Sequence, residues 1–325
     1  MACSCGREKQ LFLLALFAAL HEFRDDRYIG LMTEMSFMAG EIAGWETGSG
    51  PALLFLHGGP GVSENAGLFR PEAAGWRFIT FQQRGLTPST TDGPFTVEQN
   101  VADAVAVLDA RGVKRAVVVG HSWGGHLALH LAVAHPDRVS GLVLIDGLGV
   151  PGDGGVDQLK QEMEEMGQEM EARLLPAAAK QLQELTEQLG GVDPTDEQDA
   201  EMFLQLWPSH FADPASAPPP WDIRVCLAAN EGAMESAFEH MEAGFAEALS
   251  AIGMPVVSVL GEQSPLPLGQ GERTAALIAG AEVRIIPAAG HLPWLEQPGC
   301  GAAALARVSE RIASEDARRA ADRRL

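Results

Sequence analysis

The chain has 325 residues, of which 46% are hydrophobic and 21% charged, and its formal net charge is −21. This is the composition of an ordinary globular protein, and the length fits one large α/β domain with an insertion, or two domains. The strong negative charge argues against nucleic-acid binding, because phosphates would be repelled. Four scattered cysteines indicate neither a disulfide framework nor a metal site.

The N-terminal segment contains a short apolar run, "LFLLALFAAL" at 11–20, which follows Arg7 and Lys9. This order is typical of a signal peptide, but no cleavage site with small residues follows it. The run is far shorter than the roughly 20 residues that cross a bilayer, so the sequence predicts no membrane span. We interpret residues 1–35 as an N-terminal extension or leader, and expect a cytoplasmic protein, with secretion as the alternative.

From residue 36 onward, short apolar runs alternate with segments of helical spacing. The runs that predict buried strands are 52–56, 77–81, 116–120 and 139–146. Thr96, three residues before Gln99, indicates a helix that begins with a capping box, and Gly112 indicates its end. Strands that alternate with helices predict an α/β protein whose parallel sheet is covered on both faces.

The alternation breaks between residues 151 and 250, where the sequence is mostly helical and acidic. It resumes with a strand at 254–261, a helix near 271–279, a strand that begins at residue 282, and a final helix. The predicted domains are a core of 36–150 and 251–325 and a helical cap of 151–250. An insertion after the carboxyl end of a strand lies over the place where such sheets bind ligands.

The segment "GHSWGG" at 120–125 places Ser122 between a predicted strand and a predicted helix. In a G-x-S-x-G turn the serine has strained dihedral angles and its hydroxyl projects above the sheet. Gly120 and Gly124 leave room for this turn, and Gly125 allows the helix to pack closely. Because the N-terminus of a helix also favours developing negative charge, we predict that Ser122 is a nucleophile.

Acyl transfer also needs an oxyanion hole and a base. The N–H of Trp123, directly after the serine, is one expected donor, and Gly59 in "HGGPG" (57–61) is the other, with His57 bracing that loop. Among nine histidines, His291 lies in a loop between the last predicted strand and the final helix. Such a loop can reach Ser122 across the carboxyl edge of the sheet, so we predict that His291 is the base.

Four motifs in this order, "HGGPG", "QQRG", "GHSWGGH" and "AGHLPWLEQPG", resemble the α/β-hydrolase superfamily, and more closely its proline iminopeptidase-like branch, peptidase family S33. The resemblance covers roughly residues 36–315 and is weak in the insertion. It implies an eight-stranded, mostly parallel sheet with a helical cap after the sixth strand. It also implies Ser122 and His291 as nucleophile and base, Gly59 and Trp123 at the oxyanion positions, and no cofactor or metal.

The sequence departs from the family pattern at the acid of the triad. Family members carry this acid after the seventh strand, where the present chain has Ser264, which cannot supply charge. We expect Asp146, at the end of the sixth strand, to replace it, since some α/β-hydrolases place their acid there. The alternatives are that Glu262 is the acid, or that Asp146 only caps the following turn. The acidic cap residues with which iminopeptidases hold an amine are not matched either.

These patterns predict a serine hydrolase that cleaves an ester or amide bond of a small molecule or short peptide through an acyl-enzyme. The narrower alternative is a prolyl or aminoacyl aminopeptidase. The competing class is a non-catalytic small-molecule receptor on the same fold, against which the intact serine and histidine argue. Relatives with an aspartate nucleophile are disfavoured by Ser122. The sequence makes no prediction of the oligomeric state.

Two further patterns carry less weight. "GLGVPG" at 147–152 has the glycine spacing of a dinucleotide loop, but it leads into the cap and not into the helix of a βαβ unit. Met163, Met166, Met170 and Leu174 form a stripe at helical spacing within the cap. Such a stripe is typical of core packing, or it lines an adaptable apolar pocket.

Overall fold

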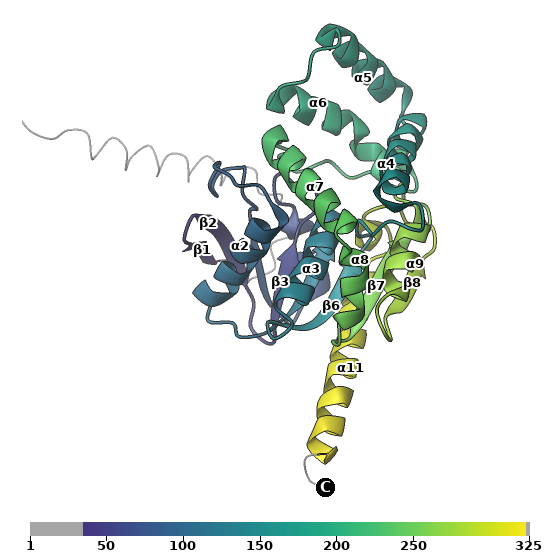
Figure 1. Cartoon of the computed structure of the whole chain (residues 1–325). Coiled ribbons are helices and arrows are strands. Elements are labelled where there is room, and N and C mark those ends of the chain that lie inside the picture. Colours follow the sequence, from purple (N-terminus) through teal and green to yellow (C-terminus); the bar gives the residue numbers. More distant parts are fainter. Residues whose placement is uncertain (1–34, 323–325) are drawn as a thin grey trace, which may run out of the picture. The chain divides into compact units, whose positions relative to one another are not determined.

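The computed structural model describes residues 35–322, and within them eight strands form one sheet (Figure 1). The strands are β1 (Met35–Ala39), β2 (Ile42–Thr47), β3 (Ala52–Leu56), β4 (Arg77–Phe81), β5 (Ala116–His121), β6 (Val139–Ile145), β7 (Val256–Gly261) and β8 (Glu282–Ile286). Their order is β1-β2-β4-β3-β5-β6-β7-β8. β2 is antiparallel to β1 and β4, and the other pairs are parallel, which confirms the predicted sheet.

Helices follow the parallel strands, as the alternation predicts. They are α2 (Val97–Ala110), α3 (Trp123–Ala134), α4 (Gly155–Ala172), α5 (Pro176–Leu189), α6 (Asp196–Leu206), α7 (Leu227–Glu242), α8 (Phe245–Ala248), α9 (Leu268–Ala276), α10 (Pro293–Glu296) and α11 (Cys300–Asp322). None of these helices is long and apolar enough to cross a bilayer. The expectation of a leader concerns residues that lie, except for Met35, outside the described part.

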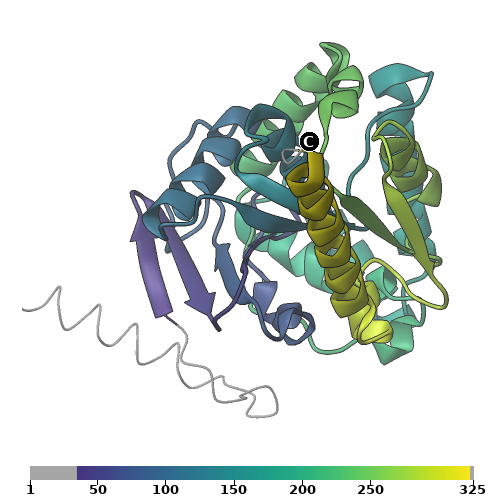
Figure 2. The ribbon, with the colours of Figure 1, turned by 90° about the horizontal axis from the view of Figure 1, so that it is seen from below.

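Both faces of the central part of the sheet are covered, and each strand there contributes to both, because successive side chains of a strand point to opposite faces. In β3, Leu54 and Leu56 pack in the cluster that contains the apolar residues of α2 and α3. Leu53 and Phe55 pack in a second cluster with the buried side of α11, which Figure 2 shows in yellow alongside the sheet. All six residues of β5 are buried, as expected for a central strand of a parallel sheet.

The chain between β6 and β7 forms the helical insertion, which runs from α4 to α8. In Figure 1 α4, α5 and α6 project away from the sheet, whereas α7 and α8 return along α3. The Phe245 ring of α8 stacks on His130 of α3 with 3.6 Å between the ring centroids. Cys226 N–H, just before α7, donates to Gly61 O over 2.7 Å. The insertion is therefore tied to the loop after β3 as well as to α3.

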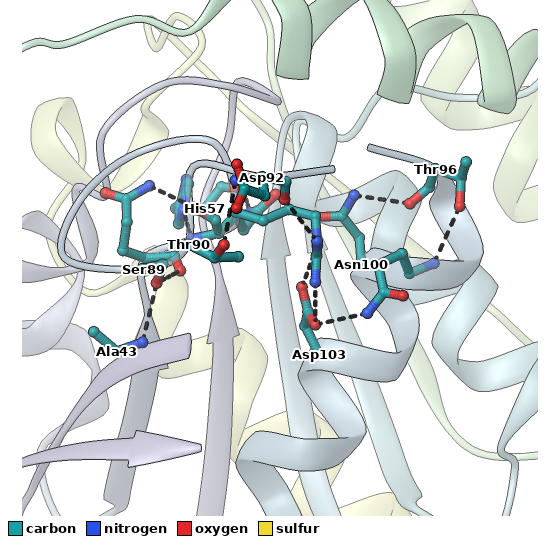
Figure 3. A network of polar contacts seen from close by, with 12 residues as sticks. Ala43, His57, Ser89, Thr90, Asp92, Thr96, Asn100 and Asp103 are labelled. Atoms are coloured by element: carbon teal, nitrogen blue, oxygen red, sulfur yellow. Dashed lines mark hydrogen bonds and ion pairs between the residues drawn. The ribbon is translucent and has the colours of Figure 1, made fainter. Parts of the chain in front are cut away.

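The start of α2 differs from its prediction in one detail (Figure 3). Thr96 caps the helix, since its hydroxyl accepts from Gln99 N–H. The predicted reciprocal hydrogen bond, from Thr96 N–H to the Gln99 side chain, is wrong. The Gln99 side chain instead donates to Asp103 Oδ1 over 3.1 Å. Asp103 is buried and also accepts two hydrogen bonds from Arg84 of the "QQRG" loop, so it offers Gln99 the stronger, charged acceptor.

We expect the buried Arg84–Asp103 pair to determine the stability of the core on this side of the sheet. The two N–O distances are 2.7 and 2.9 Å, and both side chains are only 7% exposed. Asp103→Ala leaves the guanidinium buried without its partner and should lower the free energy of unfolding by about 3–5 kcal/mol, measured in urea. The matched double variant, Arg84→Met with Asp103→Leu, should lower the free energy of unfolding much less, because neither charge is left buried without its partner. Equal losses in the two proteins would contradict this account.

Candidate active site

Ser122 occupies a sharp turn between β5 and α3. Its backbone has φ 53° and ψ −121°, a region that residues other than glycine rarely adopt. The turn is held on both sides, because Ser122 N–H donates to Ile145 O over 3.0 Å and Ser122 O accepts from Leu148 N–H over 3.0 Å. This is the strained strand-to-helix turn that the "GHSWGG" motif predicts.

The glycines of the motif are required by close backbone contacts. A Cβ atom on Gly120 would lie 2.2 Å from Gly124 O, and one on Gly124 would lie 2.0 Å from Leu56 O. A Cβ atom on Gly125 would lie 2.9 Å from the Cα atom of Gly147. The first glycine of "GLGVPG" therefore packs against the turn that carries Ser122, in a loop that enters the cap.

Asp146 and His291 are in direct contact. Asp146 Oδ2 lies 2.5 Å from His291 Nδ1, and the Ser264 hydroxyl donates to the same oxygen. The Gly261 N–H donates to the other carboxylate oxygen over 3.2 Å. Asp146 was predicted to be the last residue of its strand, but β6 ends at Ile145 because Asp146 takes a left-handed conformation with φ 44°. This turn directs the side chain toward β7 and the loop of His291.

The structure does not bring Glu262 to His291. Glu262 is exposed, and its carboxylate accepts from Ala288 N–H over 3.2 Å. Ser264, which stands where relatives are expected to carry the acid, instead hydrogen-bonds to Asp146. Within residues 35–322, the hydrogen bonds of the Asp146 carboxylate go to Gly261, Ser264 and His291, and none goes to the turn that follows Asp146.

Burial disfavours the charged form of both partners. It raises the pKa of Asp146 to about 7, although the hydrogen bonds from Ser264 and Gly261 act in the opposite direction. It lowers the pKa of His291 to about 4. Burial therefore keeps the imidazole uncharged at neutral pH, and the contact between Nδ1 and the carboxylate allows the two groups to share a proton. The pair titrates as a unit, since the two groups share this proton.

The loop of His291 is held from two sides. His291 N–H donates to His210 O over 2.7 Å, and His121 Nε2 lies 3.0 Å from His291 O. A Cβ atom on Gly290 would lie 2.2 Å from His210 O, so only glycine allows this approach. His210 belongs to the segment between α6 and α7, and no sequence motif marked it. Its contact with the loop becomes visible only in the folded chain.

The "HGGPG" loop lies against the serine. A Cβ atom on Gly58 would be 3.0 Å from Ser122 Cβ, and Gly59 has φ 66°, which favours glycine. Trp123 is the first residue of α3, and the first N–H groups of a helix have no acceptor within the helix. Gly59 and Trp123 line the same cavity as Ser122 and His291. The structure thus brings both expected oxyanion positions to the serine.

His57 braces this loop (Figure 3). Its Nε2 accepts from Gln83 N–H over 3.2 Å, so Nδ1 carries the hydrogen and donates to Gly58 O over 2.9 Å. The Gln83 side chain joins His57 O to the indole N–H of Trp123, with distances of 2.9 and 3.0 Å. Burial lowers the pKa of His57 to about 4. Gln83, from the "QQRG" motif, therefore ties the loop to the residue after the serine.

A cavity of about 200 Å³ opens beside Ser122. It is lined by Gly59, Pro60, Ser122, Trp123, Leu148, Met163, Met166, Met170, His210, Asn230, Met234, Pro265, Leu266 and His291. Three methionines of the predicted stripe on α4 are among these residues, so the stripe lines an apolar pocket. Met170 is only 7% exposed, so this side chain both packs in the core and lines the pocket. Within residues 35–322, no three His, Cys, Asp or Glu side chains converge as a metal site.

Comparisons with known proteins relate part of the sequence to several hydrolases. The 2-hydroxymuconate semialdehyde hydrolase of Pseudomonas sp. (strain CF600) is 39% identical over 111 residues, which are 32% of this chain and 39% of that protein. The proline iminopeptidase of Neisseria meningitidis is 38% identical over 109 residues, 31% of this chain and 34% of that protein. The matches thus span well under half of these relatives, and the iminopeptidase is one of several hydrolases at similar identity.

The fold agrees with solved structures over a longer range. The 2-hydroxy-6-oxo-6-phenylhexa-2,4-dienoate hydrolase of Rhodococcus sp. strain RHA1 superposes with a TM-score of 0.58 at 21% identity, and the alignment covers 86% of this chain and 99% of that one. The family described as alpha/beta hydrolase fold matches residues 51–298. Because this match includes most of the sheet, the serine turn and the loop of His291, the chain belongs to the alpha/beta hydrolase family.

Proposed function

We propose that this protein is a serine hydrolase that cleaves an ester or amide bond of a small substrate, with Ser122 as nucleophile, His291 as base and Asp146 as acid. The observation that carries the proposal is the 2.5 Å contact between Asp146 Oδ2 and His291 Nδ1, beside a cavity that Ser122 and His291 both line. The hydrolase names of the relatives support the general reaction class.

In this mechanism His291 Nε2 takes the proton of the Ser122 hydroxyl as the oxygen attacks the substrate carbonyl carbon. The Asp146 carboxylate holds the proton at Nδ1, so that Nε2 presents its lone pair, and it stabilises the imidazolium that forms. The N–H groups of Gly59 and Trp123 stabilise the oxyanion. His291 then donates its proton to the leaving group, and in the second half it activates the water that hydrolyses the acyl-enzyme.

We propose further that residues 151–250 act as a cap that sets substrate choice. Met163, Met166, Met170 and Met234, all from this segment, line the cavity beside Ser122. The aminopeptidase alternative is less well supported, because an aminopeptidase needs an acidic group to hold the amine of its substrate. Among the described residues that line the cavity there is no carboxylate.

Ser122→Ala and His291→Ala should each lower kcat by about 10³-fold or more, because the members of a triad act as a unit. A fluorophosphonate probe should label the wild-type protein at Ser122, as found by mass spectrometry of the peptide, and should not label Ser122→Ala. His135→Ala, a histidine away from the cavity, serves as the control. A folded wild-type protein that resists labelling would favour the non-catalytic receptor.

Asp146→Asn should lower kcat by several orders of magnitude, because a neutral amide fixes the wrong tautomer of His291 and cannot stabilise the imidazolium; a loss of about 10⁴-fold is expected. Glu262→Gln should lower kcat little, since the Glu262 carboxylate is at the surface and accepts a hydrogen bond from Ala288 N–H. The kcat of both variants is measured at the same pH, and their melting temperatures are compared with that of the wild-type protein to show that both are folded. The opposite ranking would assign the acid to Glu262.

The rate should fall as the pH decreases through about 7, the value to which burial raises the pKa of Asp146. Below this pH the carboxyl group is protonated and donates to Nδ1, so that the imidazole hydrogen moves to Nε2 and the base is lost. With a neutral ester, kcat/KM should lose about tenfold per pH unit on the acidic side and reach a plateau above it. A rate that is constant between pH 5 and 8 would contradict this assignment.

A further inference from the structure

The walls of the cavity carry no formal charge. Four methionines, two leucines and two prolines line it, and none of the described lining residues is Asp, Glu, Lys or Arg. Its volume of about 200 Å³ is smaller than the pockets of about 300–1,000 Å³ that hold drug-sized ligands. The methionine side chains adapt their shape to small apolar groups.

An ionic substrate group would lose its hydration in this cavity without gaining a counter-charge. The two histidines of the wall do not supply one, since burial lowers the pKa of His210 to about 3 and that of His291 to about 4. The excess of acidic residues in the whole chain adds long-range repulsion of anions. The cavity thus favours uncharged molecules.

His210 gives this apolar wall one directional polar group. Its Nδ1 lies 3.2 Å from Leu206 O and 3.2 Å from Trp207 O, and both are acceptors, so Nδ1 carries the ring hydrogen. In the neutral ring Nε2 is then an acceptor. Within residues 35–322 Nε2 has no hydrogen-bond donor, and His210 is one of the residues that line the cavity.

The position of His210 indicates which part of a substrate it faces. In the proposed mechanism His291 gives its proton to the leaving group, so the leaving group lies beside His291. The ring centroid of His210 is 5.6 Å from that of His291. A donor on the alcohol part of an ester, two carbon atoms beyond the scissile oxygen, would therefore lie near His210.

We propose that the site takes small, uncharged esters whose alcohol part carries a second hydrogen-bond donor, such as a hydroxyl group, and that His210 Nε2 accepts this hydrogen bond. The inference rests on the proposed hydrolase function and adds its substrate class. His210 is accordingly a specificity-determining residue supplied by the cap.

The test compares two esters of equal heavy-atom count, propyl butyrate and 2-hydroxyethyl butyrate, each corrected for its rate of alkaline hydrolysis. The wild-type protein should have the higher kcat/KM for the hydroxyethyl ester. We define the ratio as kcat/KM for the hydroxyethyl ester divided by kcat/KM for the propyl ester. His210→Asn keeps a donor near the position of Nδ1 but has no acceptor at Nε2, and should lower this ratio by about tenfold. His210→Gln places an amide oxygen near Nε2 and should keep the ratio within about threefold of the wild-type ratio.

The charge requirement is tested with monopropyl succinate, whose acyl part ends in a carboxylate. Its kcat/KM should be about a hundredfold or more below that of propyl butyrate, because the carboxylate is desolvated without a partner. Comparable rates for the two esters would overturn the neutral-substrate part of the proposal.

Three other results would overturn the assignment of His210. These are a corrected wild-type ratio below one, an unchanged ratio in His210→Asn, and equal loss in both variants, which would indicate a structural role. The wild-type ratio needs no variant and decides even if a variant fails to fold. If Ser122 reacts with the fluorophosphonate but neither neutral ester is cleaved, the substrate class is wrong and the hydrolase function stands. If Ser122 does not react, the hydrolase function itself fails.

Discussion

The contact between the buried Asp146 carboxylate and His291 is the interaction on which the rest of the site depends. It fixes the imidazole between the ends of β6 and β8, and Ser264 and Gly261 hold the carboxylate in turn. Because burial disfavours both ions, it raises the pKa of Asp146 and lowers that of His291, so that the imidazole stays neutral at neutral pH. Relatives are expected to carry the acid at the position of Ser264. Here that position supplies a hydroxyl that hydrogen-bonds to Asp146, the proposed acid, at the end of the neighbouring strand.

Close backbone contacts position the serine relative to this pair. Gly120 and Gly124 allow the strained turn of Ser122, and Gly58 allows the "HGGPG" loop to lie against it. The cap reaches the same place, because His210 O binds the loop of His291 and Cys226 N–H binds the loop after β3. In the proposed mechanism, these backbone hydrogen bonds would couple substrate selection by the cap to the placement of the base.

Much of this arrangement could be predicted from local sequence. The strands β3 and β4 and the serine turn follow from apolar runs and motifs, because local sterics and burial on both faces leave few alternatives. The contact of Asp146 with His291 was expected from the absence of an acid at Ser264. The Gln99 side chain was misassigned, since its acceptor Asp103 is set by the distant Arg84. His210 was missed because its relation to the site exists only in three dimensions, and no pattern within the cap records it.

The central claim, that Asp146 holds the proton of His291 Nδ1, is tested most directly by proton NMR in water. The account predicts a strongly downfield-shifted exchangeable resonance from the short hydrogen bond, present in the wild-type protein and in Glu262→Gln. The resonance should be absent from Asp146→Asn and from His291→Ala. A resonance that survives in Asp146→Asn and disappears in Glu262→Gln would contradict the account.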